Sequence, residues 1–192
     1  MPQFFGLGDR LIVNDDVFEW IELPKSVAVF GSGVIGLELG QALHRLGVKV
    51  KVFGRPGRIR PITDPEIVFY AKKTFQSEFY LDSDSTIEKI WRDNNEVVVQ
   101  YLTDGEQNVE RFEYLLAATG RKPNIENLDL SRTSLQLDSN GVPVFDPLTM
   151  QCGKSHIFIA GDINNDLTLL HEAADEGKIA GENAAGHAIG NS

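Results

Sequence analysis

A glycine-rich segment at residues 31–36 is the part of the sequence whose residue types and spacing are best suited to chemistry. It follows the pattern G-x-G-x-x-G, in which one glycine permits a tight turn, one lets backbone amides approach a pyrophosphate and one allows a helix to pack closely on a sheet. Unpaired N–H groups at the start of the following helix would stabilise the phosphates. The residues expected to line a dinucleotide diphosphate are Gly31, Ser32, Gly33, Val34, Ile35 and Gly36.

The segments on either side of these glycines predict a strand, a helix and a second strand. An apolar run at residues 27–30 precedes them, and apolar residues then recur at spacings of three and four until Gly47. Residues 48–53 alternate apolar with basic side chains, as a strand does. We therefore expect an α/β, Rossmann-like fold that binds a dinucleotide. The alternative is a strand–turn–helix without a ligand, because glycines recur in turns.

The residues after the second strand indicate which dinucleotide is bound. NAD-specific sites place an Asp or Glu about 20 residues beyond the glycines, where it accepts hydrogen bonds from the ribose 2′-OH. Here that position is Gly54, and residues 39–63 contain no carboxylate. The loop instead carries Arg55, Arg58 and Arg60, whose guanidinium groups can fork onto a 2′-phosphate. We expect NADP(H) or use of both cofactors; a solvated basic loop is the alternative.

Cysteine and histidine usage excludes several other kinds of site. Cys152 is the only cysteine, so the chain can form no internal disulfide and no multi-cysteine zinc or iron–sulfur site. We expect it to be a structural thiol rather than a nucleophile. The histidines have none of the spacings typical of a metal site, and no metal is expected. They are His44, His156, His171 and His187.

The composition is that of an ordinary globular protein and argues against two classes of partner. A formal net charge of −10 over 192 residues argues against nucleic acid or an anionic membrane surface as a partner. No apolar run approaches the roughly 18 residues of a membrane span. The first residues lack the basic region, apolar core and cleavage site of a signal peptide, so we expect a cytoplasmic protein.

The sequence after the second strand predicts further elements of an α/β domain. Asp64 and Pro65 mark the start of a helix, and a third strand is expected at residues 79–81. The face of this helix expected to be buried comprises Ile67, Val68, Phe69, Ala71 and Phe75.

From residue 86 to residue 118 the apolar period changes to two. This change predicts an antiparallel hairpin, with Asp104-Gly105 as its turn, in place of a crossover helix. A buried strand is then expected at residues 114–118, and short strands at 142–145 and 157–160. A final helix from about residue 169 is expected to bury Ala173, Ala174, Ile179, Ala180 and Ala184.

Three ordered motifs resemble the pyridine nucleotide–disulfide oxidoreductases, and among these the dihydrolipoamide dehydrogenases most of all. Their order and approximate spacing are those of the family across essentially the whole chain. The motifs are G-x-G-x-x-G-x-E at residues 31–38, A-T-G-R-K-P-N at 118–124, and I-A-G-D at 159–162, which is followed by L-H-E-A at 170–173 and E-G at 176–177.

The resemblance implies a domain organisation. In this family an FAD domain is interrupted by an NAD(P) domain and a dimerisation domain follows. Residues 23–142 resemble the NAD(P)-binding domain, while 1–22 and 143–192 resemble the flanking pieces of the FAD domain. The first FAD glycine motif, the redox-active cysteine pair and the dimerisation domain have no counterpart, so the sequence resembles an excised central segment that is expected to be inactive alone.

The resemblance also implies roles for individual residues. Gly120 would approach the diphosphate from the last strand, and Ile87 would touch the adenine. Glu38 is similar to a family glutamate that pairs with a lysine near the flavin; the alternative is an acid that complements the helix dipole. Residues similar to those that meet the flavin are Gly161 and Asp162 at the ribityl chain, and Thr168, Leu169, Leu170 and His171 at the isoalloxazine.

The implied activity is hydride exchange between a nicotinamide cofactor and FAD, with a dithiol or disulfide as second substrate and a homodimer as the intact enzyme. Arg55 and Arg60 fall where NADP-preferring relatives similar to glutathione reductase carry basic contacts, although the overall match is closer to NAD-using dihydrolipoamide dehydrogenases. Two alternatives remain open. One is a stand-alone nucleotide-binding module without turnover, and the other is a related flavoprotein with a non-disulfide acceptor.

Overall fold

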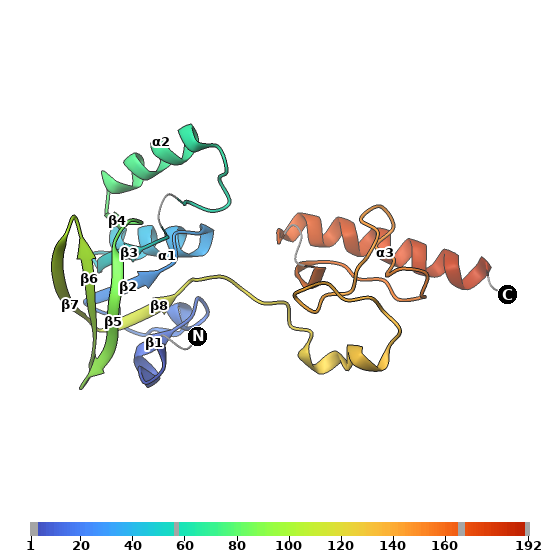
Figure 1. The fold of residues 1–192 in the computed structure, drawn as a ribbon, viewed down its shortest axis with the longest axis horizontal. Helices are drawn as coiled ribbons and strands as arrows, with labels where there is room; N and C mark the ends of the chain where they lie inside the picture. Colours follow the sequence, from blue (N-terminus) through green and yellow to red (C-terminus); the bar gives the residue numbers. More distant parts are fainter. Residues whose placement is uncertain (1–3, 56–57, 165–167, 191–192) are drawn as a thin grey trace. The chain divides into compact units, whose positions relative to one another are not determined.

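The computed structural model describes residues 4–55, 58–164 and 168–190. The chain forms two compact units, Met1–Gly120 and Arg121–Ser192 (Figure 1). Pro56 and Gly57 of the arginine loop lie outside the described residues. The cofactor-domain boundaries expected after residues 22 and 142 remain a prediction.

A parallel sheet of five strands forms the centre of the first unit. Its order is β1-β8-β2-β3-β4, and every neighbouring pair in it is parallel. The expected strand–helix–strand unit is confirmed as β2, α1 and β3. The strands are β1 (Leu11–Ile12), β2 (Ser26–Phe30), β3 (Lys49–Phe53), β4 (Tyr80–Asp82) and β8 (Tyr114–Ala117), and the helix that joins β2 to β3 is α1 (Val34–Arg45).

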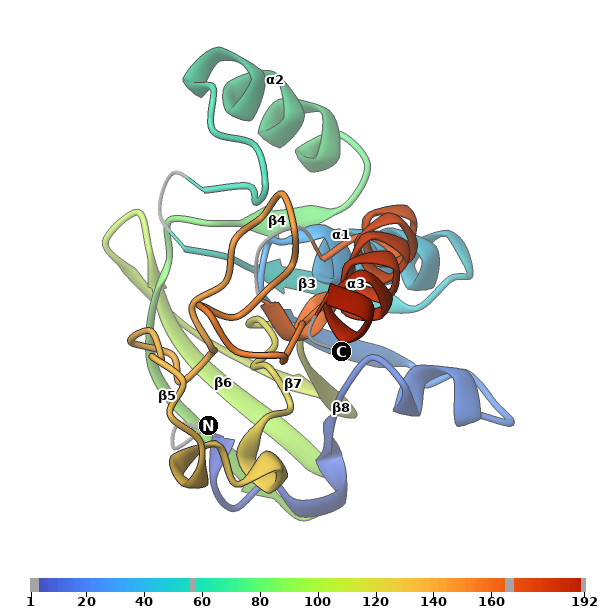
Figure 2. The ribbon, with the colours of Figure 1, turned by 90° about the vertical axis from the view of Figure 1, so that its right-hand side faces the viewer.

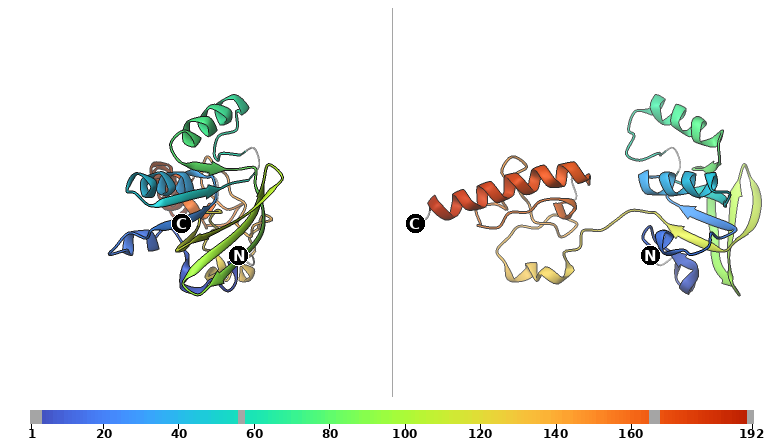
Figure 3. Two further views of the ribbon diagram at one scale, coloured as in Figure 1. Left: turned by 90° about the vertical axis from the view of Figure 1, so that its left-hand side faces the viewer. Right: turned by 180° about the vertical axis from the view of Figure 1, so that it is seen from behind.

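Different layers cover the two faces of this sheet (Figures 1 and 3). One face packs against α1 through a cluster that includes Val29, Leu37 and Val52. The other face packs against the antiparallel sheet through a second cluster that includes Phe53 and Tyr101. Burial on both faces explains why β2 and β8 read as continuous apolar runs rather than as alternating ones.

The helix α2 (Pro65–Gln76) begins as the sequence predicts. Asp64 caps it by accepting hydrogen bonds from the backbone N–H groups of Glu66 at 2.8 Å and Ile67 at 3.1 Å. The predicted buried face is wrong in part, because Ile67 is 56% exposed and Phe69 is 60% exposed. Ala71 and Phe75, four residues apart, pack against the core cluster and Val68 is partly buried, so this stripe leaves Ile67 and Phe69 on the outside.

The antiparallel sheet confirms the predicted change of period. It consists of β5 (Thr86–Asp93), β6 (Glu96–Thr103) and β7 (Glu106–Phe112), in that order. Asp104 and Gly105 connect β6 to β7 with φ of 54° and 81°. Two successive positive φ angles are those of the tight hairpin turn that Asp-Gly favours.

A polar network joins the two sheets at their interface. Lys51 Nζ on β3 donates to the Tyr101 hydroxyl on β6 at 2.9 Å and pairs with the carboxylate of Glu110 on β7. The Tyr101 hydroxyl donates to the same carboxylate at 2.6 Å. Burial, with the adjacent Glu110 carboxylate, raises the pKa of Tyr101 to about 12, so the phenol remains a hydrogen-bond donor. These bonds fix the antiparallel sheet against the face of the parallel one.

The second unit holds one long helix, α3 (Leu170–Gly190), beside irregular segments (Figures 1 and 2). The strands expected at residues 142–145 and 157–160 are wrong. Those residues form only the isolated bridges Leu137–Pro143 and Gln151–Phe158, because neither segment pairs with a neighbouring strand over several residues. The predicted buried face of α3 is wrong at Ala174, which is exposed. The helix packs through residues spaced three and four apart, such as Glu176 and Ala180.

Candidate functional site

The candidate nucleotide site lies at the carboxyl edge of the parallel sheet. From β2 the chain passes to β3 on one side, whereas β8 flanks β2 on the other. Ligands of open α/β sheets bind outside the carboxyl ends of the strands, where the order reverses in this way. The loops that follow β2, β3, β4 and β8 therefore meet at one edge, and the glycine turn follows β2 directly.

The three glycines of the motif differ in the space around them. Gly31 has a φ of 127°, and a Cβ there would lie 2.1 Å from the carbonyl oxygen of Ala118. A Cβ at Gly36 would lie 2.0 Å from the carbonyl oxygen of Gly31. At Gly33 a Cβ would meet no described atom within 4 Å. Gly31 and Gly36 are thus required by packing, while Gly33 leaves open space at the turn.

The N-terminus of α1 faces this open space. Gly33 is its N-cap, and no side chain of the described residues caps it. The first helical hydrogen bond runs from Leu37 N–H to the carbonyl oxygen of Gly33 at 3.0 Å, so the N–H groups of residues 34–36 remain available. Oriented N–H groups at the positive end of a helix dipole form an anion site.

The arginine loop after β3 is attached to the glycine turn. Ser32, 7% exposed, donates a hydrogen bond from Oγ to the carbonyl oxygen of Arg58 at 2.8 Å. Ile59 is buried in the cluster beneath α1 and holds the loop to the core. The side chains of Arg55, Arg58 and Arg60 are exposed.

Gly54 occupies the position where NAD-specific sites carry a carboxylate. A Cβ at Gly54 would lie 2.5 Å from Ser32 Oγ and 3.2 Å from Ser83 Cβ. A side chain at this position would therefore displace the Ser32 hydroxyl. The spacing of the sequence identified Gly54, but its contact with Ser32 and Ser83 depends on the tertiary structure.

Sequence reasoning missed the turn that follows β4. The Asp82 carboxylate accepts hydrogen bonds from the N–H groups of Asp84 at 2.8 Å and Ser85 at 2.9 Å, and from Thr103 Oγ1 at 2.8 Å. Burial opposes ionisation of Asp82, but these hydrogen bonds outweigh it and hold the pKa of the carboxyl below its usual value. The Asp-Ser-Asp-Ser run after a predicted strand is the signal that could have revealed this turn.

The remaining predicted residues of the first unit lie in different surroundings. Gly120, with a φ of 118°, follows β8 and so lies at the same sheet edge as the glycine turn. Ile87 packs partly against the second core cluster. Glu38 is exposed and is the fifth residue of α1, beyond the first turn, which removes the helix-dipole interpretation. Contact of Ile87 with adenine and of Glu38 with a lysine remain predictions.

The residues expected at the flavin all belong to the second unit. The Asp162 carboxylate, 49% exposed, pairs with Arg121 at 3.1 Å. Gly161 N–H donates at 2.6 Å to the carboxylate of Glu176, a buried acid on α3. The residues at and before the start of α3 are exposed, namely Thr168, Leu169, Leu170 and His171. The exposed residues before and at the start of α3 and the half-exposed Asp162 carboxylate thus leave polar groups at the surface of this unit.

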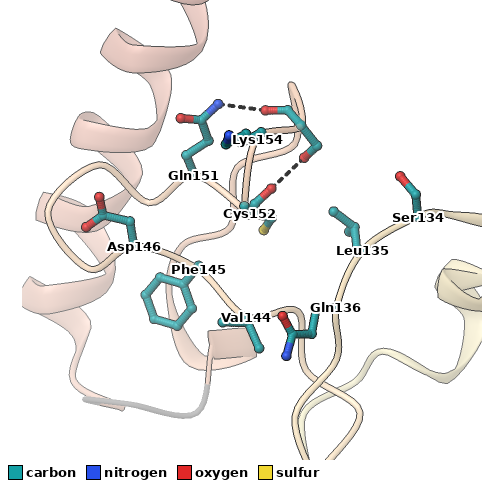
Figure 4. A pocket seen from close by; sticks show the side chains of 11 residues that line it. Ser134, Leu135, Gln136, Val144, Phe145, Asp146, Gln151, Cys152 and Lys154 are labelled. Atoms are coloured by element: carbon teal, nitrogen blue, oxygen red, sulfur yellow. Dashed lines mark hydrogen bonds between the residues drawn. The ribbon is translucent and has the colours of Figure 1, made fainter.

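A hollow of about 550 Å³ in the second unit contains none of the predicted site residues (Figure 4). It is lined in part by Leu135, Phe145, Asp146, Cys152 and Lys154. Cys152 is 1% exposed, and burial raises the pKa of its thiol. A buried thiol of raised pKa is poorly reactive, which agrees with the structural role expected for it.

The described residues contain neither a candidate metal site nor a candidate membrane-spanning helix. No group of three or more His, Cys, Asp or Glu side chains there could hold a metal ion. Among the same residues, no helix combines the length and the hydropathy needed to cross a bilayer.

Comparison with known proteins gives a family match over most of the chain. A family model described as "Pyridine nucleotide-disulphide oxidoreductase" matches residues 3–177. Dihydrolipoyl dehydrogenase of Bacillus subtilis (strain 168) is 31% identical over 93% of this chain and 38% of its own length. Mercuric reductase of Lysinibacillus sphaericus is 32% identical over 97% of this chain and 34% of its own length.

Solved structures agree with this match. LpdA of Mycobacterium tuberculosis superposes with a TM-score of 0.80 at 27% identity, over 97% of this chain and 40% of that one. The fold is also that of the HOCl-induced flavoprotein disulfide reductase RclA of Escherichia coli in its Cu(II) complex, with a TM-score of 0.73 at 21% identity over 90% of this chain and 38% of that one. The chain thus spans about two fifths or less of the length of these proteins.

Proposed function

This chain belongs to the pyridine nucleotide–disulphide oxidoreductase family, and on that premise we propose that it is the nicotinamide-dinucleotide-binding portion of a flavin-dependent oxidoreductase. Residues 23–142 would form the NAD(P)-binding domain, and residues 1–22 and 143–192 would contribute to an FAD domain. We further propose that the intact enzyme is a cytoplasmic homodimer.

One observation carries the proposal of nucleotide binding. The glycine turn has no space for a side chain at Gly31 or Gly36, yet leaves open space at Gly33 beside the N–H groups that begin α1. A fold that needed the glycines only for packing would have no reason to keep that third position empty. The space and the N–H groups suit a dinucleotide diphosphate.

The polar groups around this turn have distinct roles in the proposed site. The N–H groups of residues 34–36 hold the diphosphate. Gly120 allows β8 to approach it. Arg55 and Arg60 extend from the neighbouring loop toward the adenosine ribose, where a guanidinium can bind a 2′-phosphate. On this basis the chain prefers NADP(H) or uses both cofactors.

The second unit would meet the flavin. The Asp162 carboxylate would accept hydrogen bonds from the ribityl hydroxyls, and the exposed residues from Thr168 to His171 would meet the isoalloxazine. A bound flavin supplies the redox chemistry, accepting hydride from the nicotinamide and passing electrons to a second substrate. The chain orients both cofactors for that exchange.

The second substrate we propose is a dithiol or disulfide. With Cys152 alone, the printed sequence has no cysteine pair, so this chain by itself would turn over no dithiol. A related flavoprotein with a different acceptor is the alternative, because relatives of nearly equal identity carry the names dihydrolipoyl dehydrogenase and mercuric reductase. A nucleotide-binding module without turnover is the other alternative.

Titration of the 192-residue chain with NADH and NADPH, followed by nucleotide fluorescence, tests the proposal. We expect saturable binding, and we expect Gly33→Val to weaken both nucleotides about tenfold or more, because its side chain would fill the diphosphate space. Gly177→Ala is the matched control, since a Cβ at this α3 position also meets no described atom within 4 Å. Absence of binding, or an equal effect of both substitutions, would refute the proposal.

A further inference from the structure

The arginines of the chain fall into two groups. Outside the loop that follows β3, each one forms an ion pair with an aspartate or glutamate. Within the described residues, no carboxylate pairs with an arginine of that loop, although the chain carries 28 acidic residues. The paired arginines are Arg10, Arg45, Arg92, Arg111, Arg121 and Arg132, and the others are Arg55, Arg58 and Arg60.

Three exposed cations on one loop would not by themselves select a ligand. Flexible side chains on a mobile loop lose conformational entropy when they bind, which reduces their contribution to affinity. A loop that is already held in place loses less. What holds this loop therefore decides how well its guanidinium groups discriminate a 2′-phosphate from a 2′-hydroxyl.

The described contacts attach this loop at two points. Ile59 is buried in the core. Ser32 Oγ donates to the carbonyl oxygen of Arg58 at 2.8 Å, and Arg58 N–H donates to the carbonyl oxygen of Arg55 at 3.1 Å. Ser32 lies in the diphosphate turn itself, so this hydroxyl connects the part of the site that is common to both nucleotides with the part that can distinguish them.

Gly54 makes this connection possible. A Cβ there would lie 2.5 Å from the Ser32 hydroxyl. The same glycine therefore removes the carboxylate that would recognise a ribose 2′-OH and leaves the space that the serine occupies. A glycine and a serine that lie 22 positions apart in the sequence thus form one structural unit.

We propose that Ser32 is a positioning residue for 2′-phosphate selection: its hydroxyl fixes the loop that carries Arg55 and Arg60 against the diphosphate turn. This inference rests on the proposed function. It assigns Ser32 a role beyond lining the diphosphate, because its hydrogen is already donated to Arg58 and is not available to a phosphate. Loss of the hydroxyl should loosen the loop, which Ile59 still holds, and leave the diphosphate site intact.

The test compares the dissociation constants of NADPH and NADH in the full chain. Ser32→Ala should weaken NADPH about fivefold, the loss expected for one hydrogen bond, and change NADH less than about twofold. In an Arg55→Ala/Arg60→Ala background the same substitution should change neither nucleotide, because the two guanidinium groups that Ser32 is proposed to position are then absent. Ser83→Ala is the matched control, since Ser83 also borders Gly54 but its hydroxyl bonds to Asp84 and not to the arginine loop.

The possible results separate this inference from the proposed function. Three results would overturn the role of Ser32 while nucleotide binding stands. Ser32→Ala could weaken NADPH and NADH equally, it could weaken neither, or its effect could be undiminished in the Arg55→Ala/Arg60→Ala background. A wild-type chain that prefers NADH would do the same. A wild-type chain that binds neither nucleotide would overturn the proposed function and this inference together.

Discussion

Gly36 lies so close to Gly31 that a methyl group on Gly36 would come within 2.0 Å of the Gly31 carbonyl oxygen. The first turn of α1 therefore packs directly against the end of β2. This contact ties the helix that offers its N–H groups to the strand that positions them. The same contact makes Gly36 a structural glycine, in contrast to Gly33.

Substitution of these two glycines should therefore separate stability from binding. Gly36→Ala should lower the free energy of unfolding by about 2 kcal/mol or more, because backbone cannot move aside as a flexible side chain can. Gly33→Ala should change it by less than about 1 kcal/mol. Urea unfolding followed by tryptophan fluorescence measures both, since Trp20 and Trp91 lie in the first unit. Equal stability of the two variants would contradict this assignment.

The arginine loop should control affinity for NADPH alone. We expect Arg55→Ala and Arg60→Ala each to weaken NADPH about tenfold and to leave NADH unchanged, because a charge-assisted hydrogen bond to a phosphate is lost. Arg132→Ala is the control, since this exposed arginine pairs with Asp129 in the second unit. A strong preference of the wild type for NADH, with NADPH unaffected by either loop substitution, would rule out a 2′-phosphate site.

Asp82 should make the first unit sensitive to acid. The pKa of its carboxyl is lower in the folded chain than when unfolded, so its stabilisation is present above about pH 4 and is lost as the pH falls through the folded pKa. Asp82→Asn should cost about 1–3 kcal/mol at neutral pH and flatten the decline below about pH 4. Urea unfolding as a function of pH tests this, with Asp104→Asn in the exposed hairpin turn as the control. Parallel curves for Asp82→Asn and wild type would exclude a role for Asp82.

Glu176 should stabilise the second unit through one carboxylate oxygen. Its Oε2 accepts from Gly161 N–H at 2.6 Å and from Asn164 Nδ2 at 2.8 Å. Glu176→Ala should cost about 1–3 kcal/mol by removing the acceptor of two buried hydrogen bonds, whereas Glu176→Gln should cost less because an amide oxygen can accept both bonds. Hydrogen exchange over residues 121–192 is the measurement, because no tryptophan lies there. An equal loss of protection in both variants would show that these bonds are not responsible.

Flavin binding should be weak in this chain. Asp162 and the segment from Thr168 to His171 can contact only the flavin end of FAD, while the FAD pyrophosphate needs a second glycine turn and helix N-terminus. We expect the purified chain to be colourless and to show no dithiol oxidation. An absorption spectrum with stoichiometric flavin would refute this prediction.

The sequence by itself determined the strand–helix–strand unit, the hairpin and the glycine turn. Local rules suffice for these features. The glycine pattern has a backbone requirement at each position, Asp64 caps the helix that follows it, and Asp104-Gly105 has few turn conformations available. Each of these signals involves only a few neighbouring residues, so it can be recognised from the sequence alone.

Only the tertiary structure decided which side chains share an environment. The stripe by which α2 packs, and hence the exposure of Ile67 and Phe69, depends on how that helix lies on the core. The hydrogen bond from Ser32 to Arg58 joins residues 26 positions apart. Side-chain periodicity predicts the two faces of a helix or strand but not how that element is rotated against its neighbour. The contact between Ser32 and Gly54 forms only because parallel pairing brings the carboxyl ends of β2 and β3 to the same edge of the sheet.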